Sequence, residues 1–341
     1  MKNRLFFLGL LLAVFSNFSI VAQSDYKVAK KISVEGNGGW DYISVDETYG
    51  RIYASHSTMA QAIDIKTGNL VGTIANTNGI HGIAFAPDLN KGFTSNGRDS
   101  SVTVFNLKTF EVITVIKVTG RNPDCIVYDQ YTQQVFTFNG RSDNSTVIDA
   151  VKNKVVGTIQ LDGKPEFSVS DGKGKIYTNI EDKSMIDVID VNDMKVVKSW
   201  SIAPGEEPSG LAFDPETHRL FSVCGNKLMV VSDSEEGKVI TTLPIGSRCD
   251  GVVFDPGLKR AYSSNGEGTI TVVQEENANS FKVLETITTQ PGARTITVDK
   301  ETHHLYLPTA EYESAPAEGN RRPGIKPGTF VILDVEYLGK K

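Results

Sequence analysis

The sequence predicts an all-β fold, a seven-bladed β-propeller built as a single domain. A short apolar segment followed by a turn returns seven times at intervals of 40 to 44 residues, which is the spacing of propeller blades. The segments are rich in β-branched residues and partly alternate apolar with polar positions, as strands do. After the N-terminal segment, no stretch keeps the period of an amphipathic helix over a useful length.

Each repeat opens with a predicted strand. A turn rich in Gly, Pro, Asn and Asp follows it, and a second strand such as IYASH (52–56) or GFTSN (92–96) comes next. The seven opening strands read WDYISVD (40–46), IHGIAFA (80–86), PDCIVYD (123–129), PEFSVSD (165–171), PSGLAFD (208–214), CDGVVFD (249–255) and ARTITVD (293–299).

The later strands of each repeat predict how the ring closes. Most repeats continue with a third strand that ends in an acidic or amide residue, such as VTVFN (102–106), and a fourth, such as VITVI (112–116). The last repeat has no fourth strand, whereas an unassigned strand, 27–34, precedes the first repeat. We therefore expect residues 27–34 to complete the last blade, a three-plus-one closure that removes an exposed sheet edge.

The chain begins with a predicted signal peptide, residues 1–22. A short basic start precedes an apolar run that is too short to span a bilayer comfortably, and small residues follow near Ala22. An uncleaved anchor is the alternative. We expect export, to the periplasm or as a secreted protein, and a mature propeller domain of residues 23–341 without a membrane span. A monomer is expected.

Charge and cysteine content limit the remaining classes. The formal net charge is -6 and the pI is near 5.5, a balance that argues against a nucleic acid partner. Of the three cysteines, Cys224 and Cys249 are predicted to lie on the same face of neighbouring blades. A Cys224–Cys249 disulfide is one option, and three buried free thiols are the other.

The repeats resemble a known family. The segments IHGIAFAPDLNKGFTSN (80–96), PSGLAFDPETHRLFSVC (208–224) and HLYLPT (304–309) are similar to the YVTN repeat of the YncE-like β-propellers. The resemblance covers about residues 27–338 and implies the same seven-bladed fold. It implies no particular activity, because this fold carries many.

A candidate site follows from the predicted geometry. The first strand of each blade lines the central channel, so one slot near its start should ring one mouth of that channel. The end of the second strand and the loop after it lie beside this slot. The predicted ligand-binding residues are Asp41, His56, His81, Asn96, Arg98, Asp124, Asn139, Arg141, Glu166, Asp250, Asn265 and Arg294, with Arg121 and Arg248 on neighbouring loops.

Several interpretations of this ring stay open. Carboxylate and amide oxygens suit Ca²⁺ or Mg²⁺, whereas two imidazoles and a carboxylate would suit a transition metal. The metal-ligand candidates are Asp41, His81 and Asp124, and the catalytic candidates are His81, Asp124 and Glu166. The alternative is a solvated polar rim without a ligand. The Asn-Gly pairs at Asn96, Asn139 and Asn265 are also ideal turn formers.

Two function classes fit these features. The first is an exported binding or scaffold protein that recognises a small molecule, a glycan or a partner protein at the channel mouth. The second is a metal-assisted hydrolase, lactonase or lyase at the same mouth.

Two further expectations concern the loops. The last blade carries an insertion, residues 310–327, which emerges at the predicted mouth and would form either a lid, with Glu311, Tyr312, Glu313, Arg321 and Arg322 over the channel, or a loose rim. His218, His303 and His304 are expected on the surface of the opposite face.

Overall fold

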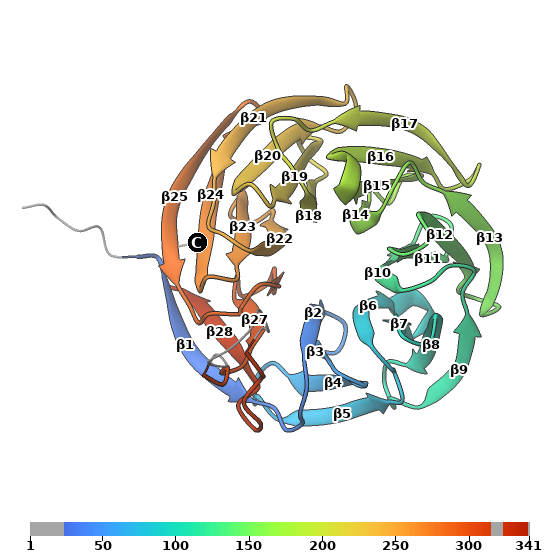
Figure 1. Ribbon diagram of the computed structural model, residues 1–341. Helices are drawn as coiled ribbons and strands as arrows, with labels where there is room; N and C mark the ends of the chain where they lie inside the picture. The colour runs from blue at the N-terminus through green and yellow to red at the C-terminus, as the bar shows by residue number, and fades with distance from the viewer. Residues whose placement is uncertain (1–23, 315–322, 340–341) are drawn as a thin grey trace, which may run out of the picture.

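A computed structural model describes residues 24–314 and 323–339, and it confirms the seven-bladed propeller. Seven four-stranded antiparallel sheets surround a central channel (Figure 1). The predicted signal peptide, residues 1–22, lies outside the described residues. Among the described residues no helix is long and apolar enough to cross a membrane. The helical turns described are the short 3₁₀ segments η1 (Pro87–Leu89) and η2 (Glu181–Lys183).

Blades 1 to 6 each run from the channel outward in chain order. The strands are β2 (Trp40–Asp46), β3 (Arg51–His56), β4 (Met59–Asp64) and β5 (Leu70–Ala75) in blade 1; β6 (Ile80–Ala86), β7 (Lys91–Asn96), β8 (Ser101–Asn106) and β9 (Val112–Lys117) in blade 2; β10 (Pro123–Asp129), β11 (Gln134–Asn139), β12 (Asn144–Asp149) and β13 (Lys154–Gln160) in blade 3. They are β14 (Pro165–Ser170), β15 (Lys175–Ile180), β16 (Met185–Asp190) and β17 (Lys195–Ser201) in blade 4; β18 (Pro208–Asp214), β19 (Arg219–Cys224), β20 (Leu228–Asp233) and β21 (Lys238–Pro244) in blade 5; β22 (Cys249–Asp255), β23 (Arg260–Asn265), β24 (Thr269–Asn277) and β25 (Ser280–Thr288) in blade 6.

Blade 7 joins the two ends of the described chain and confirms the predicted closure. Its strands are β26 (Thr297–Val298), β27 (Leu305–Thr309), β28 (Val331–Tyr337) and, outermost, β1 (Tyr26–Ser33). β1 pairs antiparallel with β28 along its whole length, from Tyr26 opposite Tyr337 to Ser33 opposite Val331. Figure 1 shows the two strands side by side in blue and red.

The first strand of blade 7 is much shorter than the predicted 293–299. Only Thr297 and Val298 pair with β27. The residues before them make hydrogen bonds to both neighbouring blades. Ser264 Oγ of blade 6 donates to the Arg294 carbonyl at 2.5 Å, and Thr295 Oγ1 donates to the Asp41 carbonyl of blade 1 at 2.5 Å.

The core lies between neighbouring blades rather than in one central layer. In a typical cluster, Tyr53 and Ile74 of blade 1 pack with Ile83 and Phe105 of blade 2. The alternation predicted for the strands produces this arrangement, because each sheet presents apolar side chains to the blade on either side. Burial of each large side chain contributes about 1.5–3 kcal/mol.

The cysteines are free thiols in the structure, and all three are buried. Cys249 Sγ lies 3.1 Å from the main-chain oxygen of Cys224. The two cysteines are thus neighbours, as predicted, but without the disulfide. Burial raises the pKa of both thiols, of Cys249 to about 11 and of Cys224 to about 12.

The prediction that His303 is a surface residue is wrong. His303 is buried, and its Nδ1 lies 2.6 Å from Asp255 of blade 6. His304 Nδ1 lies 2.7 Å from Asp334 on β28. His303 is thus buried against a carboxylate partner, as buried ionisable groups usually are, whereas His304 stays partly exposed. His218 is only partly exposed.

Candidate functional site

The residues of the predicted slot meet around one mouth of the channel. In blades 1 to 6 the slot lies inside an irregularity of the pairing between the first and second strands, for example between Trp40 and Ile43 and between Ile80 and Ile83. The same irregularity recurs in the other four of these blades. A bulge re-aims a side chain and ends regular pairing, so these repeated bulges turn the slot residues toward the axis.

Asp41, His81 and Asp124 form the centre of the ring. His81 Nδ1 lies 2.6 Å from Asp41 Oδ2 and 3.7 Å from Asp124 Oδ2. Burial alone would lower the pKa of His81, but the hydrogen bond with Asp41 and the charge of Asp124 outweigh it and raise the pKa to about 9. The imidazole is therefore positively charged at neutral pH.

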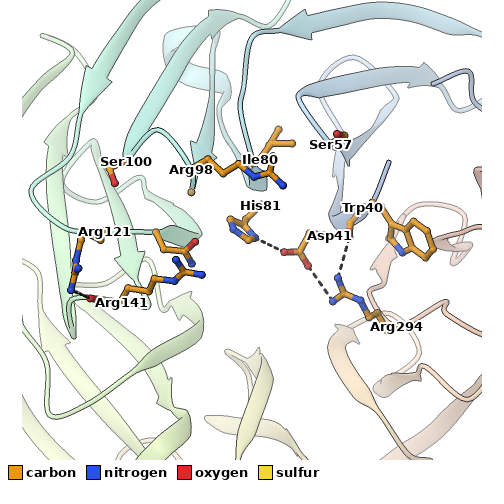
Figure 2. A pocket seen from close by; sticks show the side chains of 14 residues that line it. Trp40, Asp41, Ser57, Ile80, His81, Arg98, Ser100, Arg121, Arg141 and Arg294 are labelled. Carbon is orange, nitrogen blue, oxygen red and sulfur yellow. Dashed lines mark hydrogen bonds and ion pairs between the residues drawn. The ribbon is translucent and has the colours of Figure 1, made fainter. Parts of the chain in front are cut away.

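Arg294 links this centre to blade 6. Its guanidinium forms an ion pair with Asp250, lies 3.3 Å from Asp41 Oδ1, and donates to the Trp40 carbonyl at 3.0 Å (Figure 2). Burial would raise the pKa of Asp41, yet the hydrogen bond with His81 and the charge of Arg294 lower it. Asp41 is thus a carboxylate whose charge is already balanced on both sides.

A second group of carboxyls lies on blades 3 and 4. Burial raises the pKa of Asp124 to about 6, in opposition to the charge of His81. Burial and the charge of Asp124 raise the pKa of Glu166 to about 7, although Lys164 lies 2.7 Å away. The raised pKa values bring the titration of both carboxyls closer to neutral pH, a property that suits general acid–base chemistry.

The channel is narrowed beneath this ring. Tyr42 of blade 1 and Phe167 of blade 4 face each other across the axis, with ring centroids 5.3 Å apart. The space beside them is small, about 60 Å³. A ligand that enters the mouth would therefore meet a floor at these two rings.

Above the floor, the mouth opens into a cavity of about 720 Å³. Figure 2 shows the side chains of fourteen lining residues, with Arg121 and Arg141 on one side of His81, Arg294 on the other side and Arg98 above it in this view. The lining residues are Gly39, Trp40, Asp41, Ser57, Gly79, Ile80, His81, Gly97, Arg98, Ser100, Arg121, Asn122, Arg141 and Arg294. The volume falls within the range of small-molecule sites, about 300–1,000 Å³.

Gly97 leaves room for the centre of the ring. A Cβ atom at this position would lie 2.6 Å from His81 Nε2 and 2.8 Å from Asn122 Oδ1. Asn122 in turn forms a side-chain hydrogen bond with His81. The glycine of this Asn-Gly turn thus serves the placement of His81 as well as the turn.

Seven residues of the predicted ligand set are not among the lining residues: Asp124, Glu166 and Asp250, which belong to the charged ring, and His56, Asn96, Asn139 and Asn265. Asn96, Asn139 and Asn265 are buried, and each amide donates to hydroxyls of the third strand, as Asn96 does to Thr103 Oγ1 at 2.9 Å. His56 occupies the equivalent position in blade 1, where its Nδ1 lies 2.8 Å from Gln61 Oε1. These side chains connect strands within a blade.

Other residues of the cavity were not predicted from the sequence. Trp40, Ser57, Ser100 and Asn122 line it, and Lys164 supports Glu166. Asn122 lies two positions before the slot residue Asp124, and Lys164 lies two before Glu166. A search for polar residues at that spacing would have found both.

The insertion in the last blade lies beside the mouth. Tyr312 pairs with Ile325, and its ring centroid lies 6.3 Å from that of Trp40, a lining residue. Ile325 approaches Gly39 on the same rim. The described ends of the insertion thus contact the rim of the cavity at blade 1, while Arg321 and Arg322 lie outside the described residues.

The donor atoms of Asp41, His81 and Asp124 lie within 4.8 Å of one another, a grouping that could hold a metal ion. The local charges do not favour one. His81 Nδ1 is engaged with Asp41, and Arg294 already balances that carboxylate. A metal would have to displace a proton from His81, because the protonated ring offers no lone pair at either nitrogen.

Fold and site together define a seven-bladed β-propeller with a polar cavity at one channel mouth. No family model matches the chain, so its place among the YncE-like propellers stays a prediction. No curated protein matches it either.

Among solved structures, the chain is similar to a chain of Kuenenia stuttgartiensis hydrazine synthase, with a TM-score of 0.70 and 17% identity over 80% of this chain and 94% of that one. It is also similar to a chain in a crystal structure of the mitotic checkpoint complex, with a TM-score of 0.72 and 11% identity over 90% of this chain and 96% of that one. At such identities the likeness concerns the fold alone.

Proposed function

We propose that the protein is a binding protein that takes up a small polar molecule in the cavity at the mouth of its channel. The observation that carries this proposal is the cavity itself, about 720 Å³ with a floor beneath it and polar side chains converging on it. The charged side chains of the ring are also fixed by their partners, since Asp41 contacts His81 on one side and Arg294 on the other. Polar side chains that only face solvent would not require such fixed positions.

The test is a ligand screen followed by a structure of the complex. A library containing neutral, cationic and anionic compounds is examined by thermal unfolding, since a ligand at about 100 times its Kd stabilises the fold by about 2.7 kcal/mol. The expected result is a compound that raises Tm and whose density lies among the fourteen lining residues. Density elsewhere, or no stabilising compound of any charge, contradicts the proposal.

A metal-assisted hydrolase, lactonase or lyase is the second candidate. It is supported by the spacing of Asp41, His81 and Asp124 and by the carboxyl of Glu166, whose pKa of about 7 suits a general base. Metal analysis separates the two candidates. Stoichiometric metal that is lost in His81→Ala or Asp124→Ala, with the fold intact, favours the enzyme.

Export belongs to the same proposal, because residues 1–22 have the composition of a signal peptide. Fractionation of cells that produce the full chain, compared with a chain lacking residues 2–22, tests it. Retention of the full chain in the cytoplasm would contradict it.

A further inference from the structure

We propose that the ligand of this cavity is a compact anion with at least two negative charges, held by Arg98 and Arg141, with Arg121 adding positive charge to the same wall. The inference rests on the proposed function, because it presupposes that the cavity binds a ligand. Phosphate esters and small polycarboxylic acids share the required chemistry, namely clustered oxygen atoms that accept hydrogen bonds from guanidinium groups.

The charge of the cavity wall is the first argument. Asp41 is the only carboxylate among the fourteen lining residues shown in Figure 2, and it is paired with His81 and Arg294. The other carboxyls of the ring, Asp124, Glu166 and Asp250, lie outside this lining and face His81, Lys164 and Arg294. The charge that stays unbalanced in the wall is therefore that of its other arginines, in a protein whose formal net charge is -6. Such a local excess of positive charge does not follow from the composition of the chain. A concave wall with charge of one sign attracts ligands with charge of the opposite sign.

The second argument is that the three arginines have no anionic partner in the described part of the chain. The ion pairs of the ring belong to Arg294, His81 and Lys164. Arg121 donates to the main-chain carbonyl of Arg141 at 3.1 Å, whereas the side chain of Arg141 extends toward His81 (Figure 2). Cationic side chains that share one wall without a carboxylate repel one another, and an anion beside them would reduce that repulsion.

The third argument comes from the repeat. Arg98 and Arg141 each end an Asn-Gly-Arg sequence that follows the second strand of blades 2 and 3. Blade 6 has the same Asn-Gly pair, and Asn265 makes the same buried hydrogen bonds, yet the next residue is Glu267. The turn therefore does not require arginine. The two arginines lie in adjacent blades beside His81, where they face one cavity.

The geometry of the wall also suits a compact ligand. Gly79 has a φ of 64° and its Cβ would lie 2.5 Å from Arg98 Cγ, so the arginine passes directly over this glycine toward the mouth. Ser57, Ser100 and Asn122 add neutral polar groups around the charged wall. Several hydrogen-bond donors lie on one wall, and the channel narrows below them at Tyr42 and Phe167. This arrangement favours a ligand that fills the mouth over one that passes through the channel.

The test is isothermal titration calorimetry of the full mature chain with citrate, with inorganic phosphate and with glucose as a neutral compound. We compare the wild type with Arg98→Gln/Arg141→Gln, which removes two charges at exposed positions without touching the Asp41–His81–Arg294 ring. The control is Lys173→Gln, an exposed lysine in the turn between β14 and β15 on the opposite face. Circular dichroism confirms that each variant is folded.

We expect saturable binding of at least one anion, none of glucose, an affinity at least about tenfold weaker in the double variant, and no change in the lysine control; each tenfold corresponds to about 1.4 kcal/mol. Citrate alone would indicate carboxylates, and phosphate alone would indicate phosphate esters. The inference is overturned if neither anion binds saturably, or if the double variant binds as tightly as the wild type. A neutral or cationic compound found in the cavity by the screen would also overturn it while the proposed function stands.

Discussion

At the scale of single residues, a small number of charged side chains at the site balance one another's charge. His81 is held between two carboxylates, Asp41 at 2.6 Å and Asp124 at 3.7 Å. Arg294 takes the other side of Asp41 and also pairs with Asp250. The ring is therefore one connected network of charged residues, and a substitution at Asp41 should act most directly on the pKa of His81.

Asp41→Asn should lower the pKa of His81 from about 9, because it removes the carboxylate that accepts its hydrogen bond. The folded pKa lies above the ordinary 6.5, so the contribution of this pair to stability is complete below about pH 6.5 and is lost as the pH rises through about 9. NMR titration of the imidazole measures the shift. The titration of His304, which depends on Asp334, serves as the control and should not change. An unaltered His81 titration would contradict the network.

At the scale of elements, the third strand of blade 6 departs from its counterparts. β24 has nine residues where the other third strands of blades 1 to 5 have six. The position just after the regular strand end is occupied by buried Leu107, Ala150 and Val191 in blades 2 to 4, but by Glu275 in blade 6. The carboxyl of Glu275 is buried beside Thr217 and the carboxylate of Asp214. A carboxyl thus occupies a position that is apolar in blades 2 to 4.

Glu275→Gln should stabilise the protein at pH 8 by about 2 kcal/mol, and by less at pH 5. Burial raises the pKa of Glu275 from 4.5 to about 7, so the folded state holds this proton more tightly than the unfolded chain does. Wild-type stability therefore falls as the pH rises from about 4.5 to about 7, and the amide removes this loss. Urea unfolding at the two pH values measures the difference. Glu276→Gln, the same change at an exposed neighbour, should give no gain. An equal gain at both pH values would contradict the assignment.

The sequence predicts the elements better than it predicts the roles of individual side chains. The repeat places the slot residues of blades 1 to 6, because strand order and the recurring bulge are properties of the backbone. It fails for the length of β26, where only Thr297 and Val298 pair with β27. It also fails for Asn96 and its equivalents, because an Asn-Gly pair reads as a turn whether its amide faces solvent or a neighbouring strand. The sequence alone does not show whether the side chain of such an asparagine is buried within its blade.

At the scale of the whole molecule, the ring is continuous because β1 completes a sheet made by the other end of the chain. Each blade is stabilised mainly by its two neighbours, so a break at one junction removes one of seven similar interfaces. At this junction β1 buries Tyr26 and Ile32 against blade 7 and its neighbours. We therefore expect the closure to determine whether the seven blades unfold together and to hold blades 1 and 7 side by side at the mouth, where Arg294 reaches Asp41.

The two tryptophans make this closure testable. Trp40 lies in blade 1 with its ring centroid 5.7 Å from that of Phe330 beside β28, and Trp200 lies in blade 4 on the far side of the ring. In a chain that starts at residue 24, Trp40→Phe and Trp200→Phe variants should report the same urea midpoint, because a closed ring unfolds as one unit.

In a chain that starts at residue 34, β28 becomes an exposed edge. We expect the midpoint reported by Trp40 to fall below that reported by Trp200, since the loss begins at the opened junction and spreads blade by blade. A synthetic peptide of residues 24–33 added in excess should bring the two midpoints together again, because it restores the missing strand without a covalent link. Coincident midpoints in the shortened chain would show that blades 1 and 7 hold together without β1, and that the ring does not depend on its terminal strand.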